Sequence, residues 1–354
     1  MPLATEPIGS IPRSPELQQG MQAFAAGSIS EAEMEALFDD AVRDTVERFE
    51  ATGSPVITDG EQRKPSFVTY PIAGLHALAP DGVMIPFADG HNRQLPVLTA
   101  GPFRYATHAA TYLDRARPYA SRPLKQAVIS ASALSLLYPQ GGIDGYPQDA
   151  FIADLLDQAE IDVRGCFEAG ADSVQIDFTE GRLALKLDPG GGVLNAFVDL
   201  NNRLLERFSD EERALIGVHT CPGGDHDSTH SADVDYVELL PELFRLEAGR
   251  FYLQLASEAD RPRVLQAVAD NSRDGQQIFV GVTDPIDPRV ESAEEVRDRV
   301  LEAARFIPLH RLGTTDDCGF SPFGDDTSTA RDTAFAKIQA RVNGTKLAEV
   351  ELGV

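Results

Sequence analysis

The sequence contains no tryptophan, and it has only three cysteines and four methionines among its 354 residues. Three cysteines cannot build a disulfide framework, since any pairing leaves one thiol over. Basic side chains are also few: 31 lysines and arginines stand against 56 aspartates and glutamates, for a formal net charge of −25. Recognition of phosphate backbones or anionic membranes requires clustered basic side chains. The composition therefore argues against nucleic acids and membrane surfaces as partners.

Long apolar runs are missing as well. No stretch of about 18 apolar residues occurs, so no segment is expected to span a membrane. The first sixteen residues, MPLATEPIGSIPRSPE, lack the basic region and apolar core of a signal peptide. Together with the unpaired thiols, these absences lead us to expect a cytoplasmic protein.

Short apolar runs and amphipathic helical patterns alternate along the chain, which is typical of βα architecture. One helical pattern covers residues 30–53 and opens with Ser30 followed by Glu33, the spacing of a capping box. Others cover residues 147–170 and 292–308. The eight strand-like runs lie at residues 6–10, 55–61, 126–132, 172–177, 216–221, 251–256, 277–284 and 311–317.

Eight such units predict an α/β fold with a single (β/α)8 TIM barrel over residues 1–354. Between residues 62 and 125 further extended pieces occur, with Gly and Pro between them, and we expect an elaborated βα connection that forms a hairpin or lid. A second long connection is expected at residues 181–192. Active sites of such barrels lie at the C-terminal ends of the strands, so polar residues there are the first functional candidates.

A histidine and two cysteines suggest a metal site. His219 and Cys221 are two residues apart in one predicted strand, so their side chains point to the same face. Cys318 follows another predicted strand, at the same rim. Zinc accepts imidazole nitrogen and thiolate sulfur, and we predict that these three residues bind it. The alternative is that both cysteines are small buried apolar residues, which is how we interpret Cys166.

The loop after Cys221 contains two more histidines, His226 and His230, together with three aspartates. These residues allow a second metal site, but we favour a flexible, solvated active-site loop.

Carboxylates end two of the predicted strands. Asp177 closes the run SVQI, and Glu61 follows the strand VIT. A carboxylate at the end of a buried strand is costly unless it meets a cation or donates a proton, and two of them suit the ammonium group of an amino acid. The alternative is a salt bridge to Arg63 or Arg182.

The same rim carries further acidic residues. Asp284 and Asp287 are the candidates for proton transfer, with Arg289, Asp316 and Asp317 as supporting groups. The motifs of P-loop enzymes, dinucleotide-binding folds and serine hydrolases are absent.

These motifs together resemble the catalytic C-terminal barrel of cobalamin-independent methionine synthase, in its short single-barrel form, over nearly the whole chain. The resemblance implies that the turn Ile8-Gly9-Ser10, Glu61 and Asp177 hold homocysteine. It also implies that His219, Cys221 and Cys318 are zinc ligands, and it adds Tyr138 and Glu180 to the expected substrate-binding residues.

Three positions depart from the family pattern. Gln254 stands where the family has a glutamate zinc ligand, and Ile286 stands where it has a proton-donating histidine. Tyr138 lies at about the place where the family stacks a tryptophan on the folate ring. The departures at Ile286 and Tyr138 concern the methyl donor, which we leave open between methyltetrahydrofolate and a corrinoid or partner protein.

The sequence therefore predicts a zinc-dependent methyltransferase that converts homocysteine to methionine. A second interpretation is another zinc thiol-alkyltransferase, such as one that joins coenzyme M to an epoxide, since those enzymes resemble this chain in lacking the glutamate ligand. A third is a metal-free decarboxylase like the uroporphyrinogen decarboxylases, which would need a basic pocket. A binding protein without catalytic activity is the remaining alternative.

Overall fold

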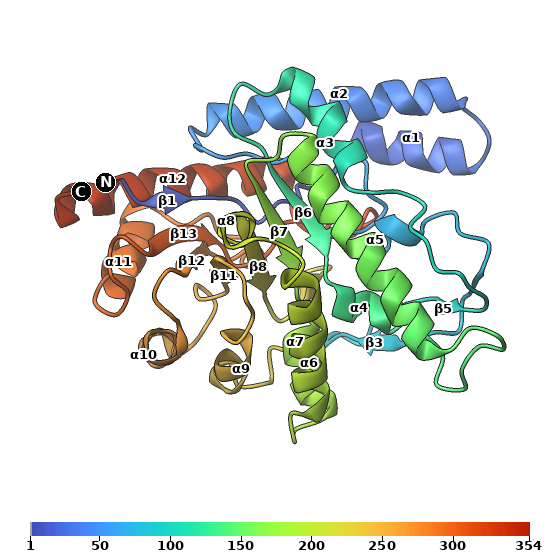
Figure 1. Cartoon of the computed structure of the whole chain (residues 1–354). Helices are drawn as coiled ribbons and strands as arrows, with labels where there is room; N and C mark the ends of the chain where they lie inside the picture. The colour runs from blue at the N-terminus through green and yellow to red at the C-terminus, as the bar shows by residue number, and fades with distance from the viewer. Residues whose placement is uncertain (1) are drawn as a thin grey trace.

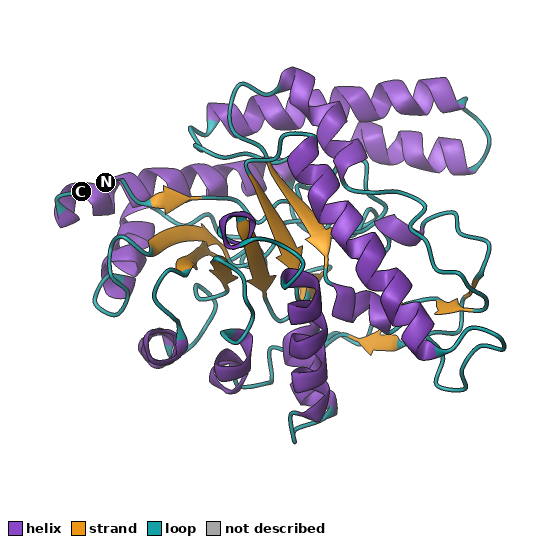
Figure 2. Ribbon diagram, in the orientation of Figure 1, coloured by secondary structure: helices purple, strands orange, loops and turns teal. Residues whose placement is uncertain are grey.

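The computed structural model describes residues 2–354, and its centre is a curled parallel sheet of seven strands with helices around the outside (Figures 1 and 2). The strand order is β1-β13-β12-β11-β8-β7-β6, and each neighbouring pair is parallel. The strands are β1 (Ala4–Thr5), β6 (Lys125–Ile129), β7 (Ser173–Asp177), β8 (Ile216–Thr220), β11 (Arg250–Leu253), β12 (Gln277–Thr283) and β13 (Leu312–Asp316).

The eighth predicted strand, at residues 55–61, does not form a ladder. Ile57 makes one isolated parallel bridge to Leu124, next to β6. On the other side, the Thr58 hydroxyl donates to the carbonyl oxygen of Gly9 at 2.8 Å. The backbone then turns, because Gly60 and Glu61 have φ angles of 67° and 56°, which a strand does not allow. The segment thus lies between β6 and the chain after β1, but among residues 2–354 the central sheet has seven paired strands and not the eight of a full barrel.

The helices follow the sequence patterns closely. Ser30 caps α2 as predicted: its hydroxyl accepts from the Glu33 amide at 3.3 Å, and the Glu33 carboxylate accepts from the Ser30 amide at 2.7 Å. The helices are α1 (Pro15–Ala25), α2 (Glu31–Ala51), α3 (Ala110–Ala116), α4 (Ala131–Ser135), α5 (Gln148–Glu168), α6 (Glu180–Leu187), α7 (Gly192–Leu205), α8 (Asp210–Arg213), α9 (Tyr236–Leu243), α10 (Arg261–Asn271), α11 (Ala293–Ala303) and α12 (Arg331–Leu352).

The elaborated connection at residues 62–125 is a pair of small antiparallel ribbons followed by α3. Strand β2 (Leu78–Ala79) pairs with β5 (Val97–Leu98), and β3 (Met84–Pro86) pairs with β4 (Asn92–Gln94). The predicted hairpin is therefore present. The second predicted connection, at residues 181–192, is wrong as a loop: most of it is helix α6, whose residues from Glu180 to Leu185 are buried.

The core fills the space between the sheet and its helices. Val174 and Ile176 of β7 pack in one apolar cluster with Leu155 and Val163 of α5. Burial of each such side chain contributes about 1.5–3 kcal/mol, which fixes the strands and so the positions of the groups at their ends. No helix among residues 2–354 is long and apolar enough to cross a membrane.

Candidate active site

A cavity of about 550 Å³ opens where the parallel strands end. Several side chains that close these strands or follow them directly meet there, which is the expected place for an active site in this architecture. The residues expected from the sequence that line the cavity are Ile8, Ser10, Glu61, Asp177, Glu180, His219, Cys221, His230 and Cys318.

The three expected metal ligands converge at the floor of this cavity. One ligand atom from each of His219, Cys221 and Cys318 lies within 4.8 Å of the other two, and the two sulfur atoms are 3.1 Å apart. Cys221 follows β8 and Cys318 follows β13, so the curl of the sheet brings together strands that are not neighbours.

The residues present fit a metal ion. Both ring nitrogens of His219 are buried and have no hydrogen-bond partner within residues 2–354. A buried polar atom without a partner costs about 1–3 kcal/mol. A cation bound to one of these nitrogens would remove that cost for the nitrogen it binds. Two causes raise the pKa of the Cys318 thiol well above its usual value: the hydrogen bond to Cys221, which is the larger, and burial. A soft cation would reverse that shift, since a coordinated thiol loses its proton.

Gln254 does not join these ligands. Its side-chain oxygen accepts from Arg182 at 3.0 Å, and its nitrogen donates to the Ser257 hydroxyl at 2.7 Å. It is absent from the cavity lining. His219, Cys221 and Cys318 are thus the protein groups gathered for a metal here.

Two buried carboxylates lie beside the ligand cluster. Asp177 of β7 is paired in register with His219 of β8, so both side chains point to the same side of the sheet. Glu61 accepts a hydrogen bond from the Lys64 ammonium at 3.0 Å, and its second oxygen is buried without a partner. Burial raises the pKa of Asp177, although His219 and a 2.7 Å hydrogen bond from Gln175 oppose the shift.

The backbone at Glu61 is held in a conformation that L-residues rarely adopt. Its positive φ is maintained by Arg13, which donates to the Glu61 carbonyl at 2.8 Å, and by the Asp59 carboxylate, which accepts from the Glu61 amide at 2.9 Å. A non-glycine residue in this region costs on the order of 1 kcal/mol or more, and such residues concentrate at functional sites. The strain directs the Glu61 side chain toward the cavity that it lines.

Glu180 opens helix α6 and lines another wall of the cavity. One of its carboxyl oxygens, Oε1, accepts from the hydroxyls of Ser130, at 2.5 Å, and Ser132. The other, Oε2, is buried without a partner. Burial raises the pKa of Glu180 to about 7, although the two serine hydrogen bonds oppose the shift.

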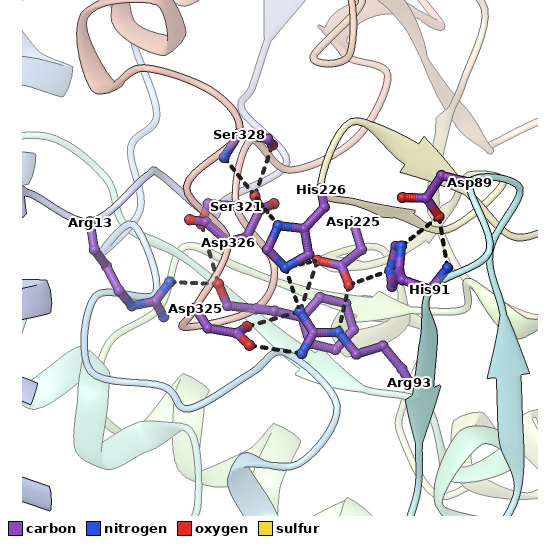
Figure 3. A network of polar contacts seen from close by, with 11 residues as sticks. Arg13, Asp89, His91, Arg93, Asp225, His226, Ser321, Asp325, Asp326 and Ser328 are labelled. Atoms are coloured by element: carbon purple, nitrogen blue, oxygen red, sulfur yellow. Dashed lines mark hydrogen bonds and ion pairs between the residues drawn. The ribbon is translucent and has the colours of Figure 1, made fainter. Parts of the chain in front are cut away.

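The β3–β4 hairpin forms a roof over the cavity through Ile85, Phe87 and Arg93. The Arg93 guanidinium donates to Asp225 at 2.5 and 3.1 Å and to Asp325 at 2.9 and 3.0 Å (Figure 3). Asp225 lies four residues after Cys221 and Asp325 seven residues after Cys318. Arg93 therefore ties the roof to both loops that carry the cysteine ligands.

The two histidines of the loop after Cys221 lie in different environments. His230 lines the cavity, and its Nδ1 lies 2.5 Å from the Ser231 hydroxyl. His226 lies with Asp225 and Asp326 in a group that has metal-ligand spacing. The Arg93 guanidinium, however, is 3.2 Å from the His226 ring and already pairs with Asp225 (Figure 3). The cation in this group is thus a protein side chain.

The remaining expected residues lie outside the cavity lining. The Asp284 carboxylate accepts from the Ile286 amide at 3.0 Å, and that of Asp287 accepts from the Arg289 amide at 2.9 Å, so each shapes its own turn. The Tyr138 hydroxyl donates to the Tyr146 carbonyl at 2.9 Å. The Gly9 carbonyl accepts from Thr58, as described above.

Comparison with known proteins agrees with this geometry. Residues 1–331 match the model of the family described as the catalytic domain of cobalamin-independent synthase. The chain belongs to this family. A 5-methyltetrahydropteroyltriglutamate–homocysteine methyltransferase of Nitratidesulfovibrio vulgaris is 24% identical over 323 residues, which are 90% of this chain and 38% of that protein. A methionine synthase of Sulfurisphaera tokodaii is 23% identical over 350 residues, 99% of this chain and 94% of that protein.

The chain thus spans less than half of the first relative and nearly all of the second. A solved B12-independent methionine synthase from Shewanella sp., in complex with selenomethionine, has the same fold. It superimposes with a TM-score of 0.77 at 18% sequence identity and covers 99% of both chains.

The sequence patterns missed Ser130, Ser132 and Arg93. Ser130 directly follows β6 and Ser132 lies in the first turn of α4, so the rule that singled out Asp177 and Glu61 applies to this strand end as well. Arg93 had no such signal, because it lies in the 62–125 connection and reaches the cavity only through the fold of the hairpin.

Proposed function

We propose that this chain transfers a methyl group to the thiol of homocysteine, forming methionine, with a zinc ion held by His219, Cys221 and Cys318. The observation that carries the proposal is that the three ligands and two buried carboxylates, Glu61 and Asp177, line one cavity. A zinc ion bound there would act as a Lewis acid that lowers the pKa of a substrate thiol.

The carboxylates account for the amino-acid part of the substrate. Both are buried, and Glu61 retains an oxygen without a partner. An ammonium group would supply the opposite charge that Asp177 lacks and a hydrogen bond to the free oxygen of Glu61, whose other oxygen pairs with Lys64. The β7–β8 register puts Asp177 next to His219, so the thiol and the ammonium of one small molecule would be gripped side by side.

The rest of the cavity has a largely apolar lining that suits a methyl donor with a flat ring. Its outer wall includes Phe67, Phe87, Leu183 and Phe323, whose side chains offer surfaces against which a ring can stack. We therefore take methyltetrahydrofolate as the first candidate donor and a methylcorrinoid as the second.

The two alternative enzyme classes, a coenzyme M alkyltransferase and a porphyrin decarboxylase, have less support. The sulfonate of coenzyme M would need a cation near the thiol site, and the groups there are carboxylates. A porphyrin decarboxylase would need a basic pocket for several carboxylates. The one arginine in the cavity lining, Arg93, already pairs with two aspartates.

The test combines metal analysis with calorimetry. Purified protein should hold about one equivalent of zinc. It should bind homocysteine at least tenfold more tightly than coenzyme M, since a hydrogen bond to a charged group contributes about 1.5–3 kcal/mol to the binding free energy. Asp177→Asn should weaken homocysteine binding and leave the zinc content unchanged. Zinc below about half an equivalent that does not respond to His219→Ala, or homocysteine affinity indifferent to Asp177→Asn, would overturn the proposal.

A further inference from the structure

The hydrogen bonds around Glu180 distinguish its two oxygens. The Ser130 hydroxyl accepts from the Ala133 amide at 3.1 Å, and the Ser132 hydroxyl accepts from the Asn201 side chain at 2.7 Å. Each hydroxyl therefore has its own proton to donate, and Oε1 of Glu180 accepts from both; the Ser132 hydroxyl also lies 3.3 Å from that of Ser130, a longer contact. An oxygen that uses both of its lone pairs to accept hydrogen bonds does not also carry the carboxylic acid proton. A proton on Glu180 would thus sit on Oε2.

Burial outweighs the serine hydrogen bonds, which favour the ionised form of Glu180, and no cation among the described residues assists them. Within residues 2–354 no lysine, arginine or histidine forms an ion pair with Glu180, and Asp177 adds repulsion. The remaining oxygen, Oε2, is buried and has no partner, while the residue itself lines the cavity. Burial beside the cavity without a cation therefore favours the protonated form, and Oε2 is the oxygen that has no partner there.

A methylated amine donor requires such an acid. When its methyl group leaves, the nitrogen keeps the electron pair of the broken bond and must take up a proton. Asp284 and Asp287, the residues that the sequence suggested for this step, do not line the cavity. Glu180 does, from the wall that helix α6 provides.

We propose that Glu180 is the catalytic acid that protonates the leaving nitrogen of the methyl donor, an inference that rests on the proposed function. The sulfur of homocysteine forms a bond to the methyl carbon as the carbon–nitrogen bond breaks. The proton moves from Oε2 to that nitrogen. The resulting carboxylate regains a proton from solvent, which has received the one released by the thiol. Thiol and N-methyl amine thus become thioether and N–H amine, with no net oxidation.

Glu180→Gln is the variant that tests the step. The amide oxygen still accepts from both serines, and the amide nitrogen replaces Oε2 but cannot release a proton. With homocysteine and 5-methyltetrahydrofolate, kcat should fall by about 10²- to 10⁴-fold, the usual contribution of a general acid. Wild-type kcat should decrease at alkaline pH, where Glu180 loses its proton, and this decrease should be absent in Glu180→Gln. With methylcobalamin, whose cobalt leaves without a proton, kcat should stay within about threefold of wild type.

Two further measurements separate this proposal from the proposed function. Zinc content and homocysteine affinity of Glu180→Gln should equal those of wild type, as should those of the control Glu168→Gln on the exposed surface of α5. Infrared difference spectra, which need no turnover, should show the carbonyl band of a carboxylic acid at neutral pH in wild type and not in the variant. Loss of zinc and homocysteine binding in wild type would instead count against the proposed function.

The proposal is overturned by an unchanged methyltetrahydrofolate rate in Glu180→Gln, by an equal loss with both donors, or by the absence of the infrared band from wild type. Wild-type activity with methylcobalamin alone would overturn it as well, because no leaving nitrogen would then exist.

Discussion

The sulfur atoms of Cys221 and Cys318 lie 3.1 Å apart, although 97 residues separate them in the chain. Two thiolates at this distance would repel each other strongly in a buried site, so the pair is stable only as thiols or around a cation. The unpartnered nitrogens of His219 favour the cation. A cation bound here would therefore also stabilise the curl of the sheet that brings the ends of β8 and β13 together.

Removal of zinc should destabilise the protein. At a free zinc concentration a thousand times Kd, binding adds about 4 kcal/mol to the free energy of unfolding. A chelator should remove that amount from wild type and almost none from Cys318→Ala, as urea denaturation would measure. Cys166→Ala is the matched control, since its sulfur is buried in α5 away from the cluster, and it should keep the wild-type response. An equal response in Cys318→Ala would contradict the metal site.

Glu61→Gln should weaken homocysteine binding by about 10- to 100-fold, because the ammonium loses a charged partner worth about 1.5–3 kcal/mol. Calorimetry with 4-mercaptobutyrate, which is homocysteine without its amino group, provides the chemical control. Its affinity should differ little between wild type and Glu61→Gln. A similar loss for both ligands would show that Glu61 supports the site without contacting the amino group.

The titration of Glu180 should appear in the stability of the protein. Its pKa is about 7 in the folded state against an ordinary value of 4.5, so the folded state binds more protons between these pH values. The protonated form therefore contributes stability that is fully present below pH 4.5 and is lost as the pH rises through 7. The difference in unfolding free energy between wild type and Glu180→Gln should change by about 3 kcal/mol over this window. Urea denaturation at pH 5 and pH 8 would measure it, and a constant difference would argue that Glu180 is ionised throughout.

Arg93→Met should loosen the roof. The variant removes the charged hydrogen bonds to Asp225 and Asp325, and amide exchange of residues 84–94 should accelerate by about 10- to 100-fold. KM for the methyl donor should rise in parallel. The control is Arg104→Met in the same connection, which breaks an ion pair with Asp154 of α5 and should leave exchange of the hairpin unchanged. Faster exchange in both variants would mean that the hairpin is not held by Arg93.

Much of the fold follows from local sequence patterns. Alternating strands and helices were predictable because each buries an apolar face of its own period, and Ser30 with Glu33 marked the start of α2. Residues 55–61 were predicted as a strand because the apolar pattern there does not reveal the left-handed backbone at Glu61. That conformation depends on Arg13 and Asp59, which fix it from neighbouring parts of the chain.

The site was predictable to the extent that it lies at strand ends. Asp177, His219, Cys221 and Cys318 all do, and all four line the cavity. Gln254 also follows its strand directly, but Arg182 and Ser257 hold its side chain away from the other ligands. Such competition between partners from distant elements has no periodic signal in the sequence.

The contacts of Arg93 have a mechanical consequence. One side chain holds the roof to Asp225 and Asp325, in the two loops that follow the cysteine ligands, so a displacement of the roof pulls on both loops at once. A molecule that enters beneath the hairpin and displaces it would therefore also shift the loops of Cys221 and Cys318, before making any contact with the two cysteines.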